Sequence, residues 1–333
     1  TEALQEARMD VLIANMKSLL GDALRGMFDQ VLARQIAECR DVLERFGVTF
    51  DRWYSEQSLY SEGKVAATLE RLRAAGHLYE KDGATWFRST DFGDDKDRVV
   101  LRENGLYTYF ASDIAYHADK LARGYDSIID VWGADHHGYI PRVKAAITAL
   151  GGDAGKLVVP LIQLVALFRG GEPVRMGKRS GNYVTLEELY GDVGVDAARF
   201  FYVLRKSDQH FDFDLDLAKS QSNDNPVYYI QYAHARVCSV LAQWGGDAAS
   251  LAAADTAPLV SGHEAALLKQ LMEYPEIVEG AARDLAPHNI AFYLKELAGG
   301  FHSYYNAERF IVEDAALTQA RLALALAVRQ VLK

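Results

Sequence analysis

The chain has 333 residues, of which 50% are hydrophobic and 25% charged, and its formal net charge is −10. This length exceeds one ordinary hydrophobic core, so we expect two or three domains, and the acidic balance argues against sequence-independent binding of nucleic acid through positive charge. The two cysteines, Cys39 and Cys238, form no metal-ligand spacing and no disulfide framework, and no apolar run approaches the ~20 residues of a membrane span. We therefore expect a cytoplasmic protein that makes no contact with a membrane.

The first hundred residues combine helices with a small strand-rich unit. Apolar residues at helical spacing predict helices over residues 1–45, and another amphipathic helix within residues 56–80 that ends near Gly76. The pair Asp82-Gly83 is typical of a hairpin turn between two strands. The unit around residues 60–103 reads as an insertion rather than as part of a continuous sheet.

The middle of the chain alternates between strands and helices. Strands are expected near residues 107–110 and 127–132, each followed by a helix, and a further apolar run covers residues 156–162. Such alternation predicts a parallel sheet with right-handed crossovers, in which ligands bind beyond the carboxyl ends of the strands. The predicted fold class of this part is therefore α/β.

From about Asn223 the alternation stops, and the remaining apolar patterns are helical. Helices are expected over residues 226–241, 264–281, 289–298 and 315–331. They predict an all-α helix bundle. The expected domains are 1–59, a helical remainder; 60–103, the insertion; 104–222, the α/β part; and 223–333, the bundle.

A cationic, glycine-flanked loop lies between a predicted strand and a predicted helix. Residues 174–182 include Met176, Lys178 and Arg179, and Thr185 with Glu188 then form a capping-box pattern. A loop of this kind suits a polyphosphate. An ordinary solvated surface loop is the alternative.

The loop Gly133-Ala134-Asp135-His136-His137-Gly138 follows a predicted strand. Its first glycine lets a ligand approach the backbone, and Asp135 can accept hydrogen bonds from a ribose diol. The paired histidines could indicate zinc, but no third ligand has a recognisable spacing, so we expect no metal. A structural hydrogen bond from one histidine is the other interpretation.

Two further groups of residues are candidate binding sites. Tyr109 and Asp113 are four residues apart at a helix start. Asp113 can pair with a guanidinium there, or it can simply be an early-helix carboxylate that the helix dipole stabilises. Tyr229, Tyr232 and Arg236 share one helical face, which suits stacking with unpaired RNA bases or packing against a neighbouring helix.

Together these segments resemble the arginyl-tRNA synthetases, class Ia aminoacyl-tRNA synthetases, and the bacterial form in particular. The resemblance covers essentially the whole chain in family order. Its carriers are residues 87–98, Thr108-Tyr109-Phe110 with Asp113, residues 131–138, residues 193–201, residues 210–214, and residues 225–236 with the sequence NPVYYIQYAHAR.

The resemblance implies a role for each candidate residue. Residues 175–182 match the mobile KMSKS loop, with Lys178 as its catalytic lysine and Met176 and Arg179 beside it on ATP; Arg175 and Gly177 depart from the motif. Gly133, Asp135 and His136 match ATP contacts. Tyr109, Asp113 and His136 match residues that read the arginine side chain. The face with Tyr229, Tyr232 and Arg236 matches an anticodon-binding helix, and residues 60–103 match the connective-peptide insertion.

The implied reaction joins L-arginine to tRNA(Arg) through arginyl-adenylate, with ATP and Mg²⁺. The arginine carboxylate is already ionised, so the first step needs positioning and charge neutralisation rather than a general base. The family implies a monomer whose activation of arginine is coupled to bound tRNA.

One family motif is absent from the sequence. No His-x-Gly-His occurs, although this HIGH turn normally contributes to the phosphate site. We therefore expect an internal fragment that is inactive alone. A non-catalytic tRNA-binding module is one alternative function, and a cysteinyl or methionyl synthetase is another.

Overall fold

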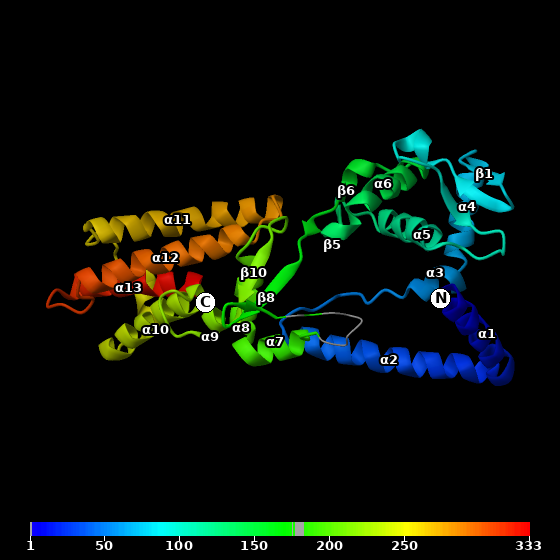
Figure 1. Ribbon diagram of the computed structural model, residues 1–333. Coiled ribbons are helices and arrows are strands. Elements are labelled where there is room, and N and C mark those ends of the chain that lie inside the picture. The colour runs from blue at the N-terminus through cyan, green and yellow to red at the C-terminus, as the bar shows by residue number, and fades with distance from the viewer. Residues whose placement is uncertain (1, 175, 177–182) are drawn as a thin grey trace. The chain divides into compact units, whose positions relative to one another are not determined.

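The computed structural model describes residues 2–174, 176 and 183–333. The chain divides into two compact units, residues 1–52 with 176–199, and residues 53–175 with 200–333. Figure 1 labels their helices and strands. The helices are α1 (Glu2–Leu20), α2 (Asp22–Arg45), α3 (Glu56–Ser61), α4 (Lys64–Ala74), α5 (Tyr109–Ala122), α6 (Ile140–Ala149), α7 (Leu186–Val193), α8 (Val195–Val203), α9 (Leu215–Lys219), α10 (Pro226–Trp244), α11 (Gly262–Arg283), α12 (His288–Ala307) and α13 (Ala315–Leu332). The strands are β1 (Leu78–Lys81), β2 (Ala84–Phe87), β3 (Arg98–Leu101), β4 (Ile128–Ile129), β5 (Trp132–Gly133), β6 (Leu157–Val158), β7 (Leu161–Ile162), β8 (Val165–Arg169), β9 (Glu172–Pro173) and β10 (Phe211–Asp214).

The first unit contains two long helices and the helix that follows the cationic loop. Helices α1 and α2 confirm the helical prediction for residues 1–45, with a break at Gly21, whose φ is +48°. The predicted capping box at α7 is also confirmed. The Thr185 hydroxyl accepts from the Glu188 backbone N–H at 3.1 Å, and the Glu188 carboxylate accepts from the Thr185 N–H at 2.8 Å.

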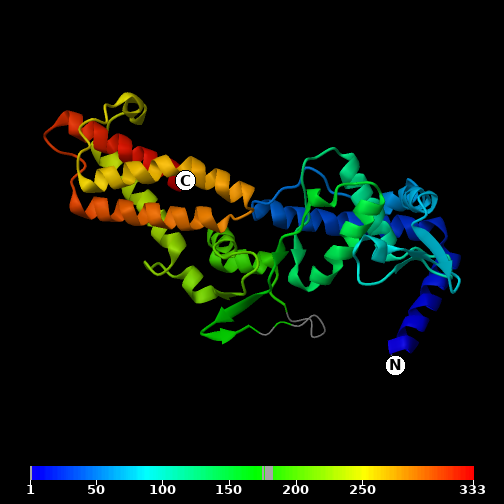
Figure 2. The same cartoon turned by 90° about the horizontal axis from the view of Figure 1, so that it is seen from above.

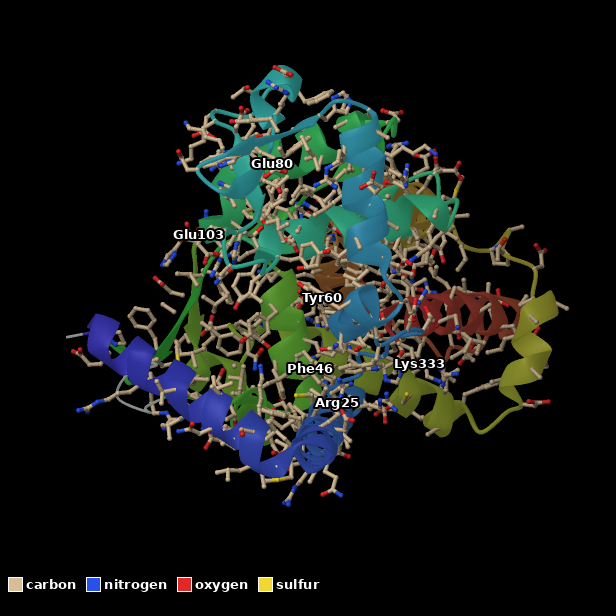
Figure 3. All side chains as sticks on the ribbon, turned by 90° about the vertical axis from the view of Figure 1, so that its right-hand side faces the viewer. Arg25, Phe46, Tyr60, Glu80, Glu103 and Lys333 are labelled. Carbon is tan, nitrogen blue, oxygen red and sulfur yellow. The ribbon has the colours of Figure 1, made fainter. Side chains whose placement is uncertain are left out.

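The region predicted as an insertion contains an antiparallel sheet in the order β1-β2-β3. Asp82 and Gly83 have φ of +53° and +75°, which confirms the predicted hairpin turn. Buried Phe87 and Val100 pack with apolar residues of α3, α4 and α5. Figure 3 shows this sheet with the exposed residues Glu80 and Glu103 labelled.

One prediction in this region was confirmed in part and one was wrong. The amphipathic helix predicted within residues 56–80 is α4, which ends at Ala74 just before Gly76, but Gly63 in a left-handed conformation separates it from α3, and residues 78–81 pair with β2 instead of continuing the helix. Residues near 107–110 do not form a strand beyond one bridge between Tyr107 and Leu101. Helix α5 instead begins at Tyr109, because the Thr108 side chain caps it.

The predicted parallel pairing is present, but each expected strand is divided. Strand β4 pairs with β6, β5 with β7, and β8 with β10, all in parallel. The Asp130 N–H donates to the Val158 carbonyl and the Trp132 N–H to the Pro160 carbonyl, which keeps the run continuous between the pairs. Pro160 has no N–H to return, so the ladder is interrupted beside it.

The carboxyl-terminal helices form an all-α bundle, as the sequence predicted. Its core includes Val237 of α10, Leu297 and Phe301 of α12, and Leu322 of α13. Helices α11 and α12 run side by side in both Figure 1 and Figure 2. None of the described helices is long and apolar enough to cross a lipid bilayer.

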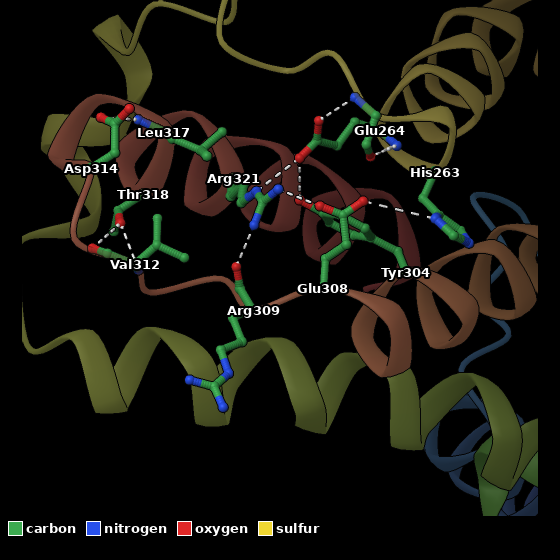
Figure 4. A network of polar contacts seen from close by, with 11 residues as sticks. His263, Glu264, Tyr304, Glu308, Arg309, Val312, Asp314, Leu317, Thr318 and Arg321 are labelled. Carbon is green, nitrogen blue, oxygen red and sulfur yellow. Dashed lines mark hydrogen bonds and ion pairs between the residues drawn. The ribbon is translucent and has the colours of Figure 1, made fainter.

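Charged side chains also lie inside this bundle (Figure 4). Glu264 of α11 is 1% exposed and accepts from Arg321 Nε of α13 at 2.8 Å and from the Tyr304 hydroxyl at 3.1 Å. Arg321 also contacts Glu308 and donates to the Arg309 carbonyl at 2.6 Å. The network therefore joins α11, α12, α13 and the segment that follows α12.

Candidate functional site

The first turns of α5 place Tyr109 and Asp113 on one wall of a pocket. The Thr108 hydroxyl accepts from the Ala111 N–H and fixes the start of the helix, so residues four apart face the same side. The pocket has a volume of about 360 Å³ and is lined by Tyr109, Asp113, Trp132, His136 and Tyr139. The structure thus brings together three residues that the sequence singled out and adds two aromatic ones.

Asp113 is the acidic group of this pocket. It is half-buried, and Tyr139 Oη donates to its Oδ2 at 2.5 Å. Burial raises the pKa of Asp113 above its ordinary value, although the Tyr139 hydrogen bond acts in the opposite direction. A carboxylate in such surroundings gains most from a cationic partner that replaces the lost water.

Aromatic rings form much of the pocket wall. Trp132 and Tyr139 meet edge to face with centroids 5.9 Å apart, and Trp132 also meets His136 at 6.5 Å. The Arg142 guanidinium lies 4.4 Å from the centre of the Tyr139 ring. A flat, delocalised cation therefore fits the pocket by charge and by its contact with ring faces.

A smaller pocket of about 170 Å³ shares Asp113 and is also lined by Glu56 and Ser112. Ser112 Oγ donates to Glu56 Oε1 at 2.8 Å, and the charge of Glu56 contributes to the raised pKa of Asp113. Sequence reasoning missed Glu56, because it stands alone at the start of α3, 57 positions before Asp113 in the chain.

A buried ionic contact joins α5 to the residue that follows β4. Asp130 follows β4, and its two oxygens contact His117 Nε2 at 2.8 Å and Lys120 Nζ at 2.5 Å. Burial acts to raise the pKa of Asp130, but the hydrogen bonds from His117 and Lys120 outweigh it and lower that pKa. His117 Nδ1 also lies 2.7 Å from the Asp113 carbonyl, one turn earlier on α5.

The predicted nucleotide contacts border the same pocket. Gly133 ends β5, and Asp135 and His136 lie in a 3₁₀ helix over Ala134–Tyr139 that leads into α6. The side chains of Asp135 and His136 are exposed, with 3.7 Å between His136 Nε2 and Asp135 Oδ2. Within the described part of the chain, no three His, Cys, Asp or Glu side chains form a group that could hold a metal ion.

The cationic loop is only partly described. Met176 is 45% exposed. Lys178 and Arg179 lie outside the described residues, so their predicted roles stay predictions.

The structure separates the three predicted RNA-binding residues of α10 by burial. Tyr232 is 40% exposed, and its ring stacks on Tyr228 with centroids 5.9 Å apart. Tyr229 is half-buried and packs against the bundle core and against His302 at 4.5 Å. The Arg236 guanidinium lies between the rings of Tyr232 and Tyr305, 4.5 Å and 4.6 Å from their centres. Tyr305 was missed, because it comes from α12.

Comparison with known proteins identifies the class first. Residues 6–210 match the family model described as tRNA synthetases class I (R), catalytic domain, and residues 230–333 match the DALR anticodon binding domain. The chain is therefore a class I aminoacyl-tRNA synthetase sequence with an anticodon-domain bundle. A methionyl-tRNA synthetase from Mycobacterium tuberculosis shares this fold with a TM-score of 0.69 at 14% identity, over 91% of this chain and 77% of that one.

Two further comparisons specify the family. An arginine–tRNA ligase from Dechloromonas aromatica (strain RCB) is 61% identical over 329 residues, which cover 99% of this chain and 56% of that relative. A crystal structure of a putative arginyl-tRNA synthetase from Campylobacter jejuni superposes with a TM-score of 0.87 at 35% identity, over 97% of this chain and 72% of that one. The chain belongs to the arginyl-tRNA synthetase family, and it spans about 56% of the length of this curated relative.

Proposed function

We propose that this chain carries the arginine-binding pocket and the tRNA-binding bundle of an arginyl-tRNA synthetase. The observation that supports the first part most is the half-buried Asp113 carboxylate in a pocket walled by Tyr109, Trp132 and Tyr139. The arginine guanidinium is planar, cationic and able to donate two parallel hydrogen bonds to one carboxylate. Its binding would offset the desolvation that raises the pKa of Asp113.

The proposed reaction has two transfers. The arginine carboxylate attacks the α-phosphate of ATP and pyrophosphate leaves; a terminal ribose hydroxyl of tRNA(Arg) then attacks the aminoacyl carbonyl and AMP leaves. Tyr109 and Asp113 would hold the side chain of the amino acid, with His136 at the pocket edge. Gly133 and Asp135 would contact the nucleoside, and Met176, Lys178 and Arg179 the phosphates, where Lys178 would neutralise developing charge.

The family also implies Mg²⁺ with ATP. The described residues offer no group of three carboxylate, histidine or cysteine ligands, and Mg²⁺ is commonly held by nucleotide phosphates with few protein ligands. We assign no step to the metal ion.

The bundle is proposed to bind the anticodon arm of tRNA(Arg). Its support is the match to the anticodon binding domain, together with the exposed Tyr232 beside Arg236 on α10. Rings and guanidinium planes on a surface can stack with unpaired bases.

A ligand pair tests the proposed arginine pocket. Isothermal titration of the chain with L-arginine should give heat of binding, whereas L-citrulline, which has nearly the same shape without the charge, should bind at least tenfold more weakly. Asp113→Asn should remove this difference. Equal affinity for the two ligands in the unmodified chain would contradict the guanidinium assignment.

A further inference from the structure

Arg236 is held by a buried residue of another helix. His302 of α12 is 7% exposed, and its Nδ1 lies 3.0 Å from Arg236 Nη1 of α10. Its Nε2 lies 3.0 Å from the backbone carbonyl of Tyr229, and Asn306 gives Nη1 a second, longer contact at 3.4 Å. Arg236, which contacts the exposed Tyr232, is thus held by hydrogen bonds to two residues of α12, His302 and Asn306.

The partners of His302 determine its protonation. A guanidinium can only donate and a carbonyl can only accept, so Nδ1 must accept from Arg236 and Nε2–H must donate to Tyr229. This is one neutral tautomer. Burial lowers the pKa of His302, the Tyr229 carbonyl acts to raise it, and the charge of Arg236 lowers it further. The neutral form required by the contacts is therefore the one that the surroundings favour.

The tether leaves much of the guanidinium available. In the described part of the chain, Nη1 is the guanidinium nitrogen of Arg236 that has hydrogen-bond partners, and the centres of the Tyr232 and Tyr305 rings lie 4.5 Å and 4.6 Å from the guanidinium carbon. Nε and Nη2 remain as a planar pair of donors. Such a pair matches two oxygens of a phosphate or the acceptor edge of a base.

We propose that His302 is a positioning residue for RNA binding, which fixes Arg236 between Tyr232 and Tyr305 so that its remaining donors are directed at the RNA. This inference rests on the proposed function of the bundle. A free arginine side chain would lose rotamer entropy when RNA binds, and a side chain that is already ordered loses less. His302 acts through Arg236 and does not touch the RNA.

His302→Phe tests the proposal, since it keeps a ring in the core and removes both hydrogen bonds. The affinity for the anticodon stem-loop RNA of an arginine tRNA should fall roughly five- to tenfold. His288→Phe, on the same helix and without contact to Arg236, is the matched control and should leave affinity unchanged.

A double-mutant cycle separates positioning from general packing. If His302 acts through Arg236, then adding His302→Phe to Arg236→Ala should cause no further loss of RNA affinity. The same fold loss in both backgrounds, or no loss in the unmodified background, would overturn the inference. If Arg236→Ala and Tyr232→Ala both leave RNA affinity unchanged, the proposed RNA-binding face itself is wrong.

Lowering the pH provides a test on the unmodified chain, should His302→Phe fail to fold. Protonated His302 cannot accept from Arg236, and the titratable groups that face its ring are Arg236, Tyr229 and Tyr232 of α10. Because the pKa of His302 is lowered, its protonation occurs below the ordinary histidine pKa of about 6.5. As the pH is lowered from neutral through that region for as far as the chain stays folded, RNA affinity should fall by more in the unmodified chain than in Arg236→Ala, relative to each protein at neutral pH. Parallel pH profiles would contradict the proposal.

Discussion

Tyr139 donates a hydrogen bond to Asp113 across 2.5 Å and thereby joins the start of α6 to α5 at the proposed arginine pocket. The bond occupies one lone pair of Oδ2, and a carboxylate has about four such sites. Asp113 can therefore keep this bond while it accepts two more from a guanidinium. The contact orients the carboxylate before any ligand arrives.

Asp113→Asn should make the chain more stable while it removes arginine binding. Because the pKa of Asp113 is raised in the folded state, the folded chain binds more protons than the unfolded chain between the ordinary pKa of about 3.9 and the raised value. The free energy of unfolding therefore falls as pH rises through this window. At pH 7 the amide should increase it by about 0.5–1 kcal/mol in urea unfolding. A destabilised variant would show that the carboxylate is structural.

Tyr139→Phe should shift the pH dependence of arginine binding upward. The Tyr139 hydrogen bond lowers the pKa of Asp113, so its loss should raise that pKa further. Arginine needs the ionised carboxylate, and its affinity should then disappear at a higher pH as the solution is acidified. Calorimetric titrations from pH 7.5 to 5 measure the midpoint, with Tyr125→Phe, at an exposed tyrosine, as the control. An unchanged midpoint would contradict the prediction, because it would show that the Tyr139 hydrogen bond does not affect the pH dependence of arginine binding.

Much of the architecture could be predicted because it depends on local patterns. Apolar spacing located the helices of the bundle, the capping box at Thr185 located the start of α7, and Asp82-Gly83 located the hairpin, since each signal acts within a few residues. The division of the strands at Pro160 could have been read from the missing N–H of proline. The start of α5 at Tyr109 was obscured by residues with high strand propensity, which the Thr108 cap overrides.

Residue spacing predicted the candidate sites only where their residues share one element, and His136 joined Tyr109 and Asp113 through the family resemblance alone. Tyr109 with Asp113, and Tyr232 with Arg236, follow from helical spacing. Glu56, Tyr139, Tyr305 and His302 come from other elements, and a single sequence contains no signal for contacts of that kind. The pairing of Asp94 with Arg98 has no such signal either: Asp94 lies in an acidic run before β3, yet it is 8% exposed and its Oδ2 accepts from Arg98 Nε at 2.7 Å.

Arg199→Met should loosen the end of α2. Arg199 Nη1 donates to the carbonyls of Phe46 and Gly47 at 2.7 Å and 2.5 Å, where a helix C-terminus carries unsatisfied acceptors. We expect the free energy of unfolding to fall by about 1–2 kcal/mol, with faster amide exchange over residues 40–48. Gly47→Ala should act similarly, since its φ is +76° and a Cβ there would lie 2.5 Å from Arg199 Nη1.

Arg205→Gln is the control for that change, because Arg205 is an exposed arginine just beyond α8. In Arg205→Gln, the amide hydrogen exchange near residue 46 should match that of the unmodified chain. Equal protection in Arg199→Met would show that water replaces the guanidinium without cost.

Arg321→Met should be the most destabilising of these changes. It leaves the Glu264 carboxylate, which is 1% exposed, without its cation, and removal of one partner from a buried pair costs about 3–5 kcal/mol. The double variant Glu264→Leu with Arg321→Met removes both charges and should recover part of this loss. Urea unfolding followed by helical circular dichroism measures both, and Lys295→Met, at an exposed site on α12, is the control.

The pH dependence of stability gives a second check on the Glu264–Arg321 pair. Burial acts to raise the pKa of Glu264, but the hydrogen bonds from Ser261, Tyr304 and Arg321 lower it below its ordinary value of about 4.3. The stability from Glu264 is therefore present above that value and is lost as pH falls through the lowered pKa. Glu264→Gln should flatten this part of the profile, and an unchanged profile would mean that the carboxylate contributes no net stability.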